Sequence, residues 1–447
     1  MTFIDFFKSR LATRRSLRTR LWRVGGLLAV FMWTMFVVKC VSGKDRLTWD
    51  KLGHDFLAFY YGGTCARTGH YEQLFDLSAT RAFEQKIGRD AGMSLGSSFG
   101  PWWNPPFAAW IFAPLSALPY LQALHVWWII SLLCLAISIF LMCRMLDGGW
   151  KTRMLTPFLI LSAMFPCFQA FGHGQNTFLS LLLLTITVSL WRGGRLLWAG
   201  IVCGMLFYKP QLGVLVAVVL CLGEGRRALM GVCITGTALV LVNMLTMPGT
   251  MHEFAYQMPQ NIRWIEEENV YHWDRHVTLK AFWREAIQGR EAGPPATSTR
   301  ILWGVSEVAL LSGLATLLVA ARRNKNPASR RDRLISAVIV AMPLLMPFYF
   351  DYDLLLLSVG IVVYAADYQR ELAVSESTQA EDRWLVRMFV ILYIGLQLLM
   401  FLNEPRVNPI VPLVAVLAVL LIRRGLRPAP QLMAESTANF PPAALAA

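Results

Sequence analysis

The stretch "MLTPFLILSAMFPCFQAFGHGQNTFLSLLLLTITVSLW" (154–191) contains 38 consecutive residues without Asp, Glu, Lys or Arg. At about 1.5 Å per residue, one helix of this length would be much longer than the roughly 30 Å core of a bilayer. The polar turn "GHGQN" (172–176) divides the stretch, so we expect two membrane crossings joined there. The stretch therefore predicts a polytopic, all-helical membrane protein.

Composition and charge placement agree with this prediction. Apolar residues make up 55% of the chain and charged residues 16%, a balance beyond what a soluble core requires. The net charge of +14 lies largely in clusters beside apolar blocks, such as 322–333 and 423–427. Such clusters are typical of cytoplasmic loops and anionic headgroups, so we expect membrane lipids and no nucleic acid as partners.

The distribution of Lys and Arg predicts about twelve transmembrane helices with both termini cytoplasmic. We expect a basic cytoplasmic segment at 1–23, a transmembrane domain at 24–423 and a disordered cytoplasmic tail at 424–447. Two long external loops, about 43–119 and 247–300, are rich in aromatic residues and predict amphipathic helices along the outer membrane face. The apolar segments 196–207 and 212–222 are too short for lipid-exposed helices, so we expect them to be tilted, buried or re-entrant.

Five motifs carry a family resemblance: "HDFLAFYYGGTCARTGHYEQLFD" (54–76), "WWNPPFAAWIFAPLSALP" (102–119), "GHGQNTFLSLLLL" (172–184), "AGIVCGMLFYKPQLGVLV" (199–216) and "MPFYFDYDLLLL" (346–357). In this order they resemble glycosyltransferase family 87, which comprises polyprenyl-phosphate-sugar-dependent mannosyltransferases of the GT-C superfamily. The resemblance covers roughly residues 50–360. Asn104 departs from the pattern, because the family usually has a Tyr before the Pro pair.

The resemblance implies a GT-C-type helical bundle in the bacterial inner membrane, with a periplasmic active site. It implies inverting transfer of a hexose, with mannose expected, from a polyprenyl phosphate to a lipid or glycan acceptor. We expect no cofactor beyond the lipid-linked sugar donor, and neither a G-x-G-x-x-G unit nor a soluble D-x-D segment is present.

Asp55 is the expected catalytic residue. Inverting transfer to an alcohol needs a carboxylate that takes the acceptor proton, and Asp55 lies near the mouth of the first external loop, in the stretch 54–76 that carries the resemblance. The alternative is that Asp55 caps a loop helix that begins around Phe56.

Lys209 and Gln211, in the external turn "YKPQ", are the expected contacts of the donor phosphate. Negative charge grows on the leaving phosphate, and a cation or hydrogen-bond donors must stabilise it. The alternative for Lys209 is an interfacial lysine whose ammonium group extends to water. Arg263, Arg275 and Arg284 in the second loop are weaker candidates, since exposed arginines are mostly solvated.

The remaining candidates are polar or aromatic residues expected to contact the sugar or the acceptor: Tyr60, Asn104, His173, Gln175, Asn176 and Asp353. Each has a structural alternative. The residues of "GHGQN" can cap the following helix, Tyr60 can pack among aromatics, and Asp353 can pair with a nearby base. Asp351 and Asp353 together could hold a divalent ion, but we expect no metal site. The main rival function is a transporter or lipid flippase, which predicts repeat symmetry and small external loops, and the sequence has neither.

Overall fold

The computed structural model describes residues 23–38 and 53–427, except for the gaps at 24, 36, 94, 97–98, 150–152, 154–156, 159–160, 324–326, 375–379 and 400–406. Most of the predicted basic segment 1–23 and of the predicted tail 424–447 lies outside the described residues. The last described helix continues to Leu426, into the first residues of that tail.

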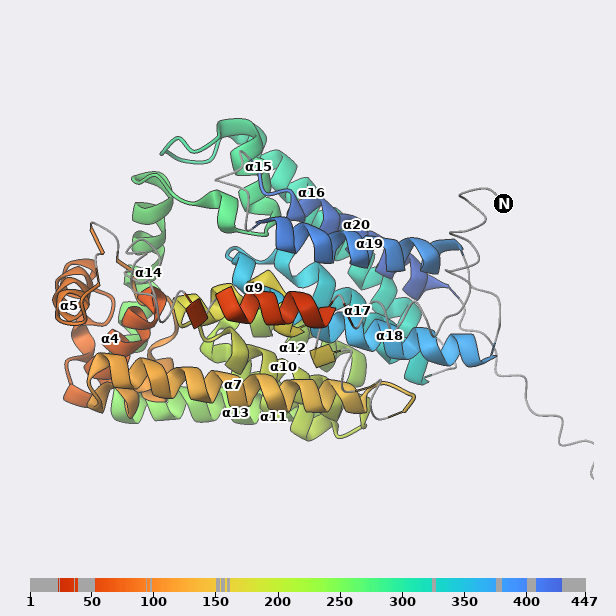
Figure 1. Ribbon diagram of the computed structural model, residues 1–447, viewed down its shortest axis with the longest axis horizontal. Coiled ribbons are helices and arrows are strands. Elements are labelled where there is room, and N and C mark those ends of the chain that lie inside the picture. Colours follow the sequence, from red (N-terminus) through yellow and green to blue (C-terminus); the bar gives the residue numbers. More distant parts are fainter. Residues whose placement is uncertain are drawn as a thin grey trace, which may run out of the picture.

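Helices account for nearly all regular structure in the described part of the chain. They are α4 (His54–Thr68), α5 (Leu77–Asp90), α6 (Ala109–Phe112), α7 (Tyr120–Arg144), α9 (Phe165–His173), α10 (Thr177–Arg192), α11 (Leu196–Met205), α12 (Pro210–Glu224), α13 (Arg226–Thr246), α14 (Thr250–Glu267), α15 (Leu279–Gln288), α16 (Thr297–Arg323), α17 (Pro327–Leu345), α18 (Leu357–Val374), α19 (Ala380–Leu398) and α20 (Ile410–Leu426). Short 3₁₀ turns include η1 (Tyr71–Gln73), η4 (Leu206–Tyr208), η5 (Trp273–Arg275) and η6 (Asp351–Leu356). The predicted all-helical fold is confirmed, and most helices run along the long axis of the molecule (Figure 1).

Three described helices are long and apolar enough to cross a membrane: α7 with 25 residues, α13 with 21 and α16 with 27. Four shorter apolar helices accompany them: Gly25–Met35, Thr177–Arg192, Leu196–Tyr208 and Pro210–Glu224. The long helices expose large apolar side chains such as Ile129, Leu245 and Val305, which suits contact with lipid chains. The chain is therefore a membrane protein, whereas twelve crossings stay a prediction.

Glycines allow α11 and α13 to pack unusually closely. A Cβ atom on Gly200 would lie far inside van der Waals distance of the Ala228 carbonyl oxygen, and one on Gly231 would collide with the Leu197 carbonyl oxygen. Thr235 adds a hydrogen bond from its hydroxyl to the Ile201 carbonyl at 2.8 Å. Small residues that bring helix backbones together in this way are the usual basis of helix association in lipid.

A group of buried ion pairs joins several helices at one end of the bundle. Arg424 of α20 donates to Asp367 of α18 at 2.6 Å and to Asp382 of α19 at 2.8 Å, and Arg333 of α17 also contacts Asp367. We call this group the ionic cluster; its members are Arg192, Asp332, Arg333, Asp367, Arg370, Glu371, Asp382 and Arg424. The ionic cluster fastens the ends of α10, α17, α18, α19 and α20 to one another.

The opposite end of the bundle is covered by α4, α5 and α14, which together we call the cap (Figure 1). Gly53 is the N-cap of α4 and has φ of 74°, a left-handed conformation that glycine adopts without steric cost. Its N–H donates to the Gly172 carbonyl at 2.7 Å, and its carbonyl accepts from the Tyr120 hydroxyl at 2.6 Å. These bonds place the first turn of α4 against the "GHGQN" turn between α9 and α10.

Candidate active site

A cavity of about 610 Å³ lies between the cap and the bundle, within the usual size range of small-molecule sites. Its lining combines polar groups from six separate segments with aromatic rings. The polar lining residues are His54, Asp55, Asn104, Gln175, Asn176, Lys209, Gln211, Arg275 and Asp353, and the aromatic ones include Phe59, Trp102, Trp103, Phe348, Phe350 and Tyr352. Val214, whose side chain is exposed on α12, also lines the cavity.

Asp55 lies in the first turn of α4 and faces this cavity. Its carboxylate accepts a hydrogen bond from Gln175 Nε2 at 2.6 Å and contacts His54 Nδ1 at 3.2 Å. His173 Nδ1 approaches the same carboxylate at 3.4 Å. The helix begins at His54 and has Gly53 as its N-cap with no capping side chain, so the alternative that Asp55 caps this helix is wrong.

The neighbours of Asp55 keep it ionised. Burial alone would raise the pKa of this carboxyl, but the positive charge and hydrogen bonds of His173 and His54 together hold the pKa well below its ordinary value of 3.8. About a quarter of the Asp55 side chain remains exposed. An ionised and accessible carboxylate can accept a proton from a hydroxyl group in the cavity.

The turn that follows α9 supplies two amide side chains. Gln175 uses one amide nitrogen on Asp55, as described above, whereas Asn176 makes no side-chain cap bond to α10. Both the nitrogen and the oxygen of the Asn176 side-chain amide are buried in the cavity wall without a hydrogen-bond partner. Buried polar groups are normally satisfied, so this amide is placed to meet a polar ligand.

Lys209 is buried in the wall of the cavity, which is inconsistent with a lysine extending to water. Its ammonium group donates to Asp353 Oδ2 at 2.7 Å, and Thr177 Oγ1 donates to the other Asp353 oxygen at 2.7 Å. Asp353 thus both lines the cavity and pairs with a base. Gln211 lies on the first turn of α12, half-buried in the same wall.

A second ion pair lies on another part of the wall. Arg275 of η5 donates to Asp351 from Nη2 at 3.1 Å and from Nε at 3.5 Å. Gln169 of α9 donates to Asp351 Oδ2 at 2.7 Å. Asp351 and Asp353 therefore pair with different cations, and no group of three or more His, Cys, Asp or Glu able to hold a metal ion occurs in the described ranges.

Two predicted contacts lie outside the cavity lining. Tyr60 is buried among aromatic rings and its hydroxyl donates to the Leu118 carbonyl at 2.9 Å, so the packing alternative describes it. His173 is not among the residues that line the cavity, and its Nδ1 atom lies 3.4 Å from the Asp55 carboxylate. By contrast, the buried Asn104 lines the cavity, and its contact with a ligand stays a prediction.

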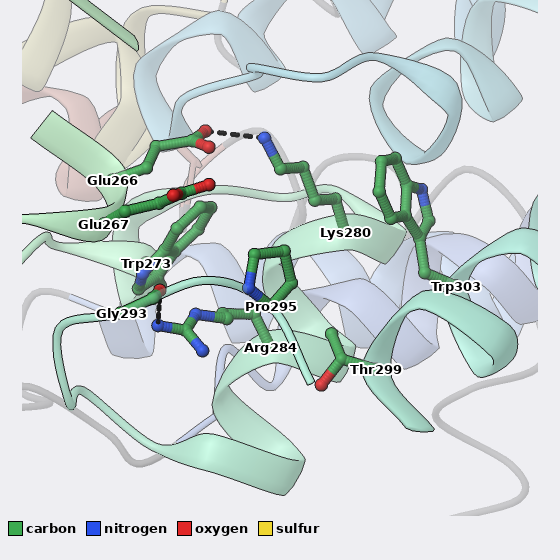
Figure 2. Close-up of a pocket in the computed structure, with 9 residues that line it drawn as sticks. All are labelled: Glu266, Glu267, Trp273, Lys280, Arg284, Gly293, Pro295, Thr299 and Trp303. Carbon is green, nitrogen blue, oxygen red and sulfur yellow. Dashed lines mark hydrogen bonds and ion pairs between the residues drawn. The ribbon is translucent and has the colours of Figure 1, made fainter. Parts of the chain in front are cut away.

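A much smaller pocket, of about 10 Å³, lies where α14, α15 and α16 meet. Figure 2 shows Lys280 directed toward Glu266, to which its ammonium group donates at 2.6 Å, and Arg284 directed toward the carbonyl of Gly293 at 2.8 Å. This volume is enough for about one water molecule. The ion pair between Glu266 and Lys280 joins the end of α14 to α15, and the pocket is too small for a sugar.

Comparison with known proteins identifies the family. A family model for glycosyltransferase family 87 matches residues 102–347, more than half of the chain. The chain belongs to glycosyltransferase family 87. No curated protein and no solved structure matches it.

This family 87 protein is therefore a membrane glycosyltransferase. The matched range contains Asn104, Gln175, Asn176, Lys209 and Arg275, all of which line the cavity. Asp55 precedes the matched range and Asp353 follows it, so their placement beside the matched residues comes from the geometry alone.

Two residues that contact charged groups of the site, His54 and Gln169, were not predicted from the sequence, and Arg275 was considered a weaker candidate. His54 precedes Asp55 directly, and Gln169 lies four residues before His173, on the same face of a helix. Arg275 was ranked as weak because it was expected to be solvated, yet it lines the cavity and is paired with Asp351.

Proposed function

We propose that this membrane glycosyltransferase transfers a hexose, with mannose as the expected sugar, from a polyprenyl phosphate to a lipid or glycan acceptor with inversion. The single observation that carries the proposal is the ionised carboxylate of Asp55 facing a cavity that also holds cationic and amide groups. The family assignment favours a transferase over a transporter or flippase. The reaction requires no cofactor other than the lipid-linked donor.

In the proposed reaction Asp55 accepts the proton of the acceptor hydroxyl while that oxygen attacks the anomeric carbon. The bond from the anomeric carbon to the phosphate oxygen breaks, and the polyprenyl phosphate leaves with the bonding electron pair. Gln175 and His54 orient the carboxylate through the contacts given above. His173 acts as a positioning residue, because it touches Asp55 and not the cavity.

The donor is proposed to lie along the wall that carries Lys209 and Gln211, with its phosphate near the ammonium group. Asn104 and Asn176 then contact hydroxyl groups of the sugar or the acceptor; the unpartnered amide of Asn176 is the best-supported of these contacts. Asp353 acts through Lys209, which it holds in place. The half-buried ring of Trp103 provides a surface on which a sugar ring can stack.

We further propose that the cap faces the periplasm and that the ionic cluster lies near the cytoplasm, with the protein in the bacterial inner membrane. The support is the predicted topology, in which the loops about 43–119 and 247–300 are external. Helices α4, α5, α14 and α15 belong to these two loops.

The decisive experiment compares wild type and Asp55→Asn with a polyprenyl-phosphate mannose donor, measuring both the transfer rate and the melting temperature. Asn keeps the size of the side chain but cannot take up the acceptor proton, so we expect a loss of roughly 10² to 10⁴-fold in rate with little change in stability. A rate above about a tenth of wild type would contradict the assignment of Asp55.

Asp76 provides a matched control, because it does cap a helix: its carboxylate accepts hydrogen bonds from Ser78 N and Ala79 N at the start of α5. Asp76→Ala should lower stability by about 1 kcal/mol and leave the transfer rate close to that of wild type.

A further inference from the structure

The guanidinium group of Arg275 has unused hydrogen-bond donors at the cavity wall. Asp351 takes one hydrogen bond from Nη2 and one from Nε, and Nη1 has no hydrogen-bond partner among the described residues. A guanidinium carries five N–H groups in a planar fork, so at least two remain for a ligand. Because Arg275 lines the cavity, those donors are available to a molecule bound there.

We propose that Arg275 binds the phosphate group of the lipid-linked donor, and that Asp351 and Gln169 hold its guanidinium in position. This inference rests on the function proposed above, and it assigns the principal phosphate contact to a residue of the second external loop.

Comparison with Lys209 favours Arg275 for this contact. The Lys209 side chain is 8% exposed and its ammonium group is held at 2.7 Å by the buried Asp353, whereas the Arg275 side chain is 29% exposed. A planar fork can hold two oxygens of a phosphate while it keeps its carboxylate partner, which a single ammonium group does less well. Lys209 is therefore a secondary contact in this arrangement.

The backbone around Arg275 is fixed by long-range pairing. His276 forms an isolated bridge with Phe350, and the N–H of Val277 donates to the Tyr349 carbonyl at 2.8 Å. The guanidinium lies 5.7 Å from the ring centre of Phe350 and 5.8 Å from that of Tyr352. A charged group held this firmly loses little conformational freedom when an anion binds.

Helix α9 connects this cation to the carboxylate of Asp55. Gln169 reaches Asp351, the partner of Arg275, and His173, one turn later on α9, reaches Asp55. Burial alone would lower the pKa of Arg275, but the negative charges of Asp351 and Asp55 raise it above its ordinary value. Arg275 is thus cationic and close enough to Asp55 to interact with its charge. This suits a single displacement, in which the group that binds the leaving phosphate and the base act on the same bound sugar.

The test measures how full-length protein in lipid nanodiscs binds polyprenyl phosphate and the uncharged polyprenol of the same chain length. Wild type should bind the phosphate more tightly, by roughly 10- to 100-fold for a charge-assisted contact. Arg275→Met should lose most of this preference, and Arg275→Lys, which keeps the charge without the fork, should retain part of it. Gln169→Leu should raise the KM for the donor with little effect on kcat, because it acts only by positioning.

Arg263→Met is the matched control, since Arg263 is exposed on α14 and does not line the cavity; it should behave as wild type. If wild type prefers the phosphate and Arg275→Met keeps that preference in full, the inference is overturned while the proposed function stands. If Arg275→Met does not fold, the other two variants decide. The inference is overturned if Arg275→Lys keeps the full preference for the phosphate and Gln169→Leu has a normal KM for the donor. If wild type shows no preference for the phosphate, the phosphate-linked donor itself is rejected.

Discussion

At the scale of single residues, Asp55 is held in its charged form against the effect of burial. Its folded pKa lies below the ordinary value, so its charge stabilises the fold at pH values above that ordinary value, and this contribution is lost as the pH falls through the folded pKa. His173 is the largest of the favourable contributors. The imidazole of His173 thus stabilises the charged carboxylate, and by lowering its pKa it also makes Asp55 a weaker base.

Replacing His173 should shift the pH dependence of the reaction. His173→Gln removes the imidazole whose interactions lower the pKa of Asp55, so the pKa of Asp55 should rise and the acid limb of the transfer rate should move to higher pH. The measurement is a pH profile of kcat/KM for wild type and variant. His70→Gln serves as the control, because His70 is exposed and pairs with Glu72 away from the cavity; an unshifted limb in His173→Gln would refute the coupling.

The sequence predicted part of the site because several of its members lie in recognisable local motifs. Asp55, the "GHGQN" turn and Lys209 were recognised from local motifs, and the structure brings them together around one cavity. The support for Arg275 could not be predicted, since Gln169 and Asp351 are 182 residues apart and no periodicity reports such a pairing. For Tyr60 the sequence left ligand contact and aromatic packing open, because its spacing from Asp55 does not show what packs against the helix.

At the scale of helices, the charge pattern predicted where a helix begins and ends better than what the helix packs against. The predicted segment 196–207 matches the apolar helix Leu196–Tyr208, since Arg195 and Lys209 bound it on both sides. Its close packing against α13 was not predicted. An apolar run looks the same whether lipid or another helix covers it, so burial and the number of crossings cannot be read from composition.

The contact between α11 and α13 gives a prediction at this scale. Gly200→Ala places a methyl group against the Ala228 carbonyl and must push the helices apart, so we expect about 1–3 kcal/mol of destabilisation and a lower melting temperature. Gly236→Ala, on α13 with open space around it, should be neutral or slightly stabilising because alanine favours helix. Equal melting temperatures for the two variants would show that the close approach is not important for stability.

At the scale of the whole molecule, the ionic cluster and the cavity lie at opposite ends of the same helices. Helix α10 begins beside the cavity at Thr177 and ends at Arg192, in the ionic cluster. Helix α18 likewise follows the η6 turn that carries Asp353 and reaches the ionic cluster through Asp367. The cluster therefore sets the relative positions of helices whose other ends form the site.

Breaking the ionic cluster should destabilise the protein strongly. Arg424→Met leaves Asp367 and Asp382 buried without their main partner, which typically costs about 3–5 kcal/mol. Arg227→Met, at an exposed position on α13, should change stability by less than about 0.5 kcal/mol. Thermal unfolding in the same detergent compares the two, and a small shift for Arg424→Met would mean that the cluster is dispensable for stability.

One short helix, α9, supports both the carboxylate of Asp55 and the ion pair of Arg275. Its two supporting side chains are four residues apart, a rise of about 6 Å that covalent geometry and helical hydrogen bonds keep constant. Long helices tilt and shift when a bilayer thickens or thins. Helix α9 has only nine residues, so the spacing of the two groups that it supports should stay the same in membranes of different thickness.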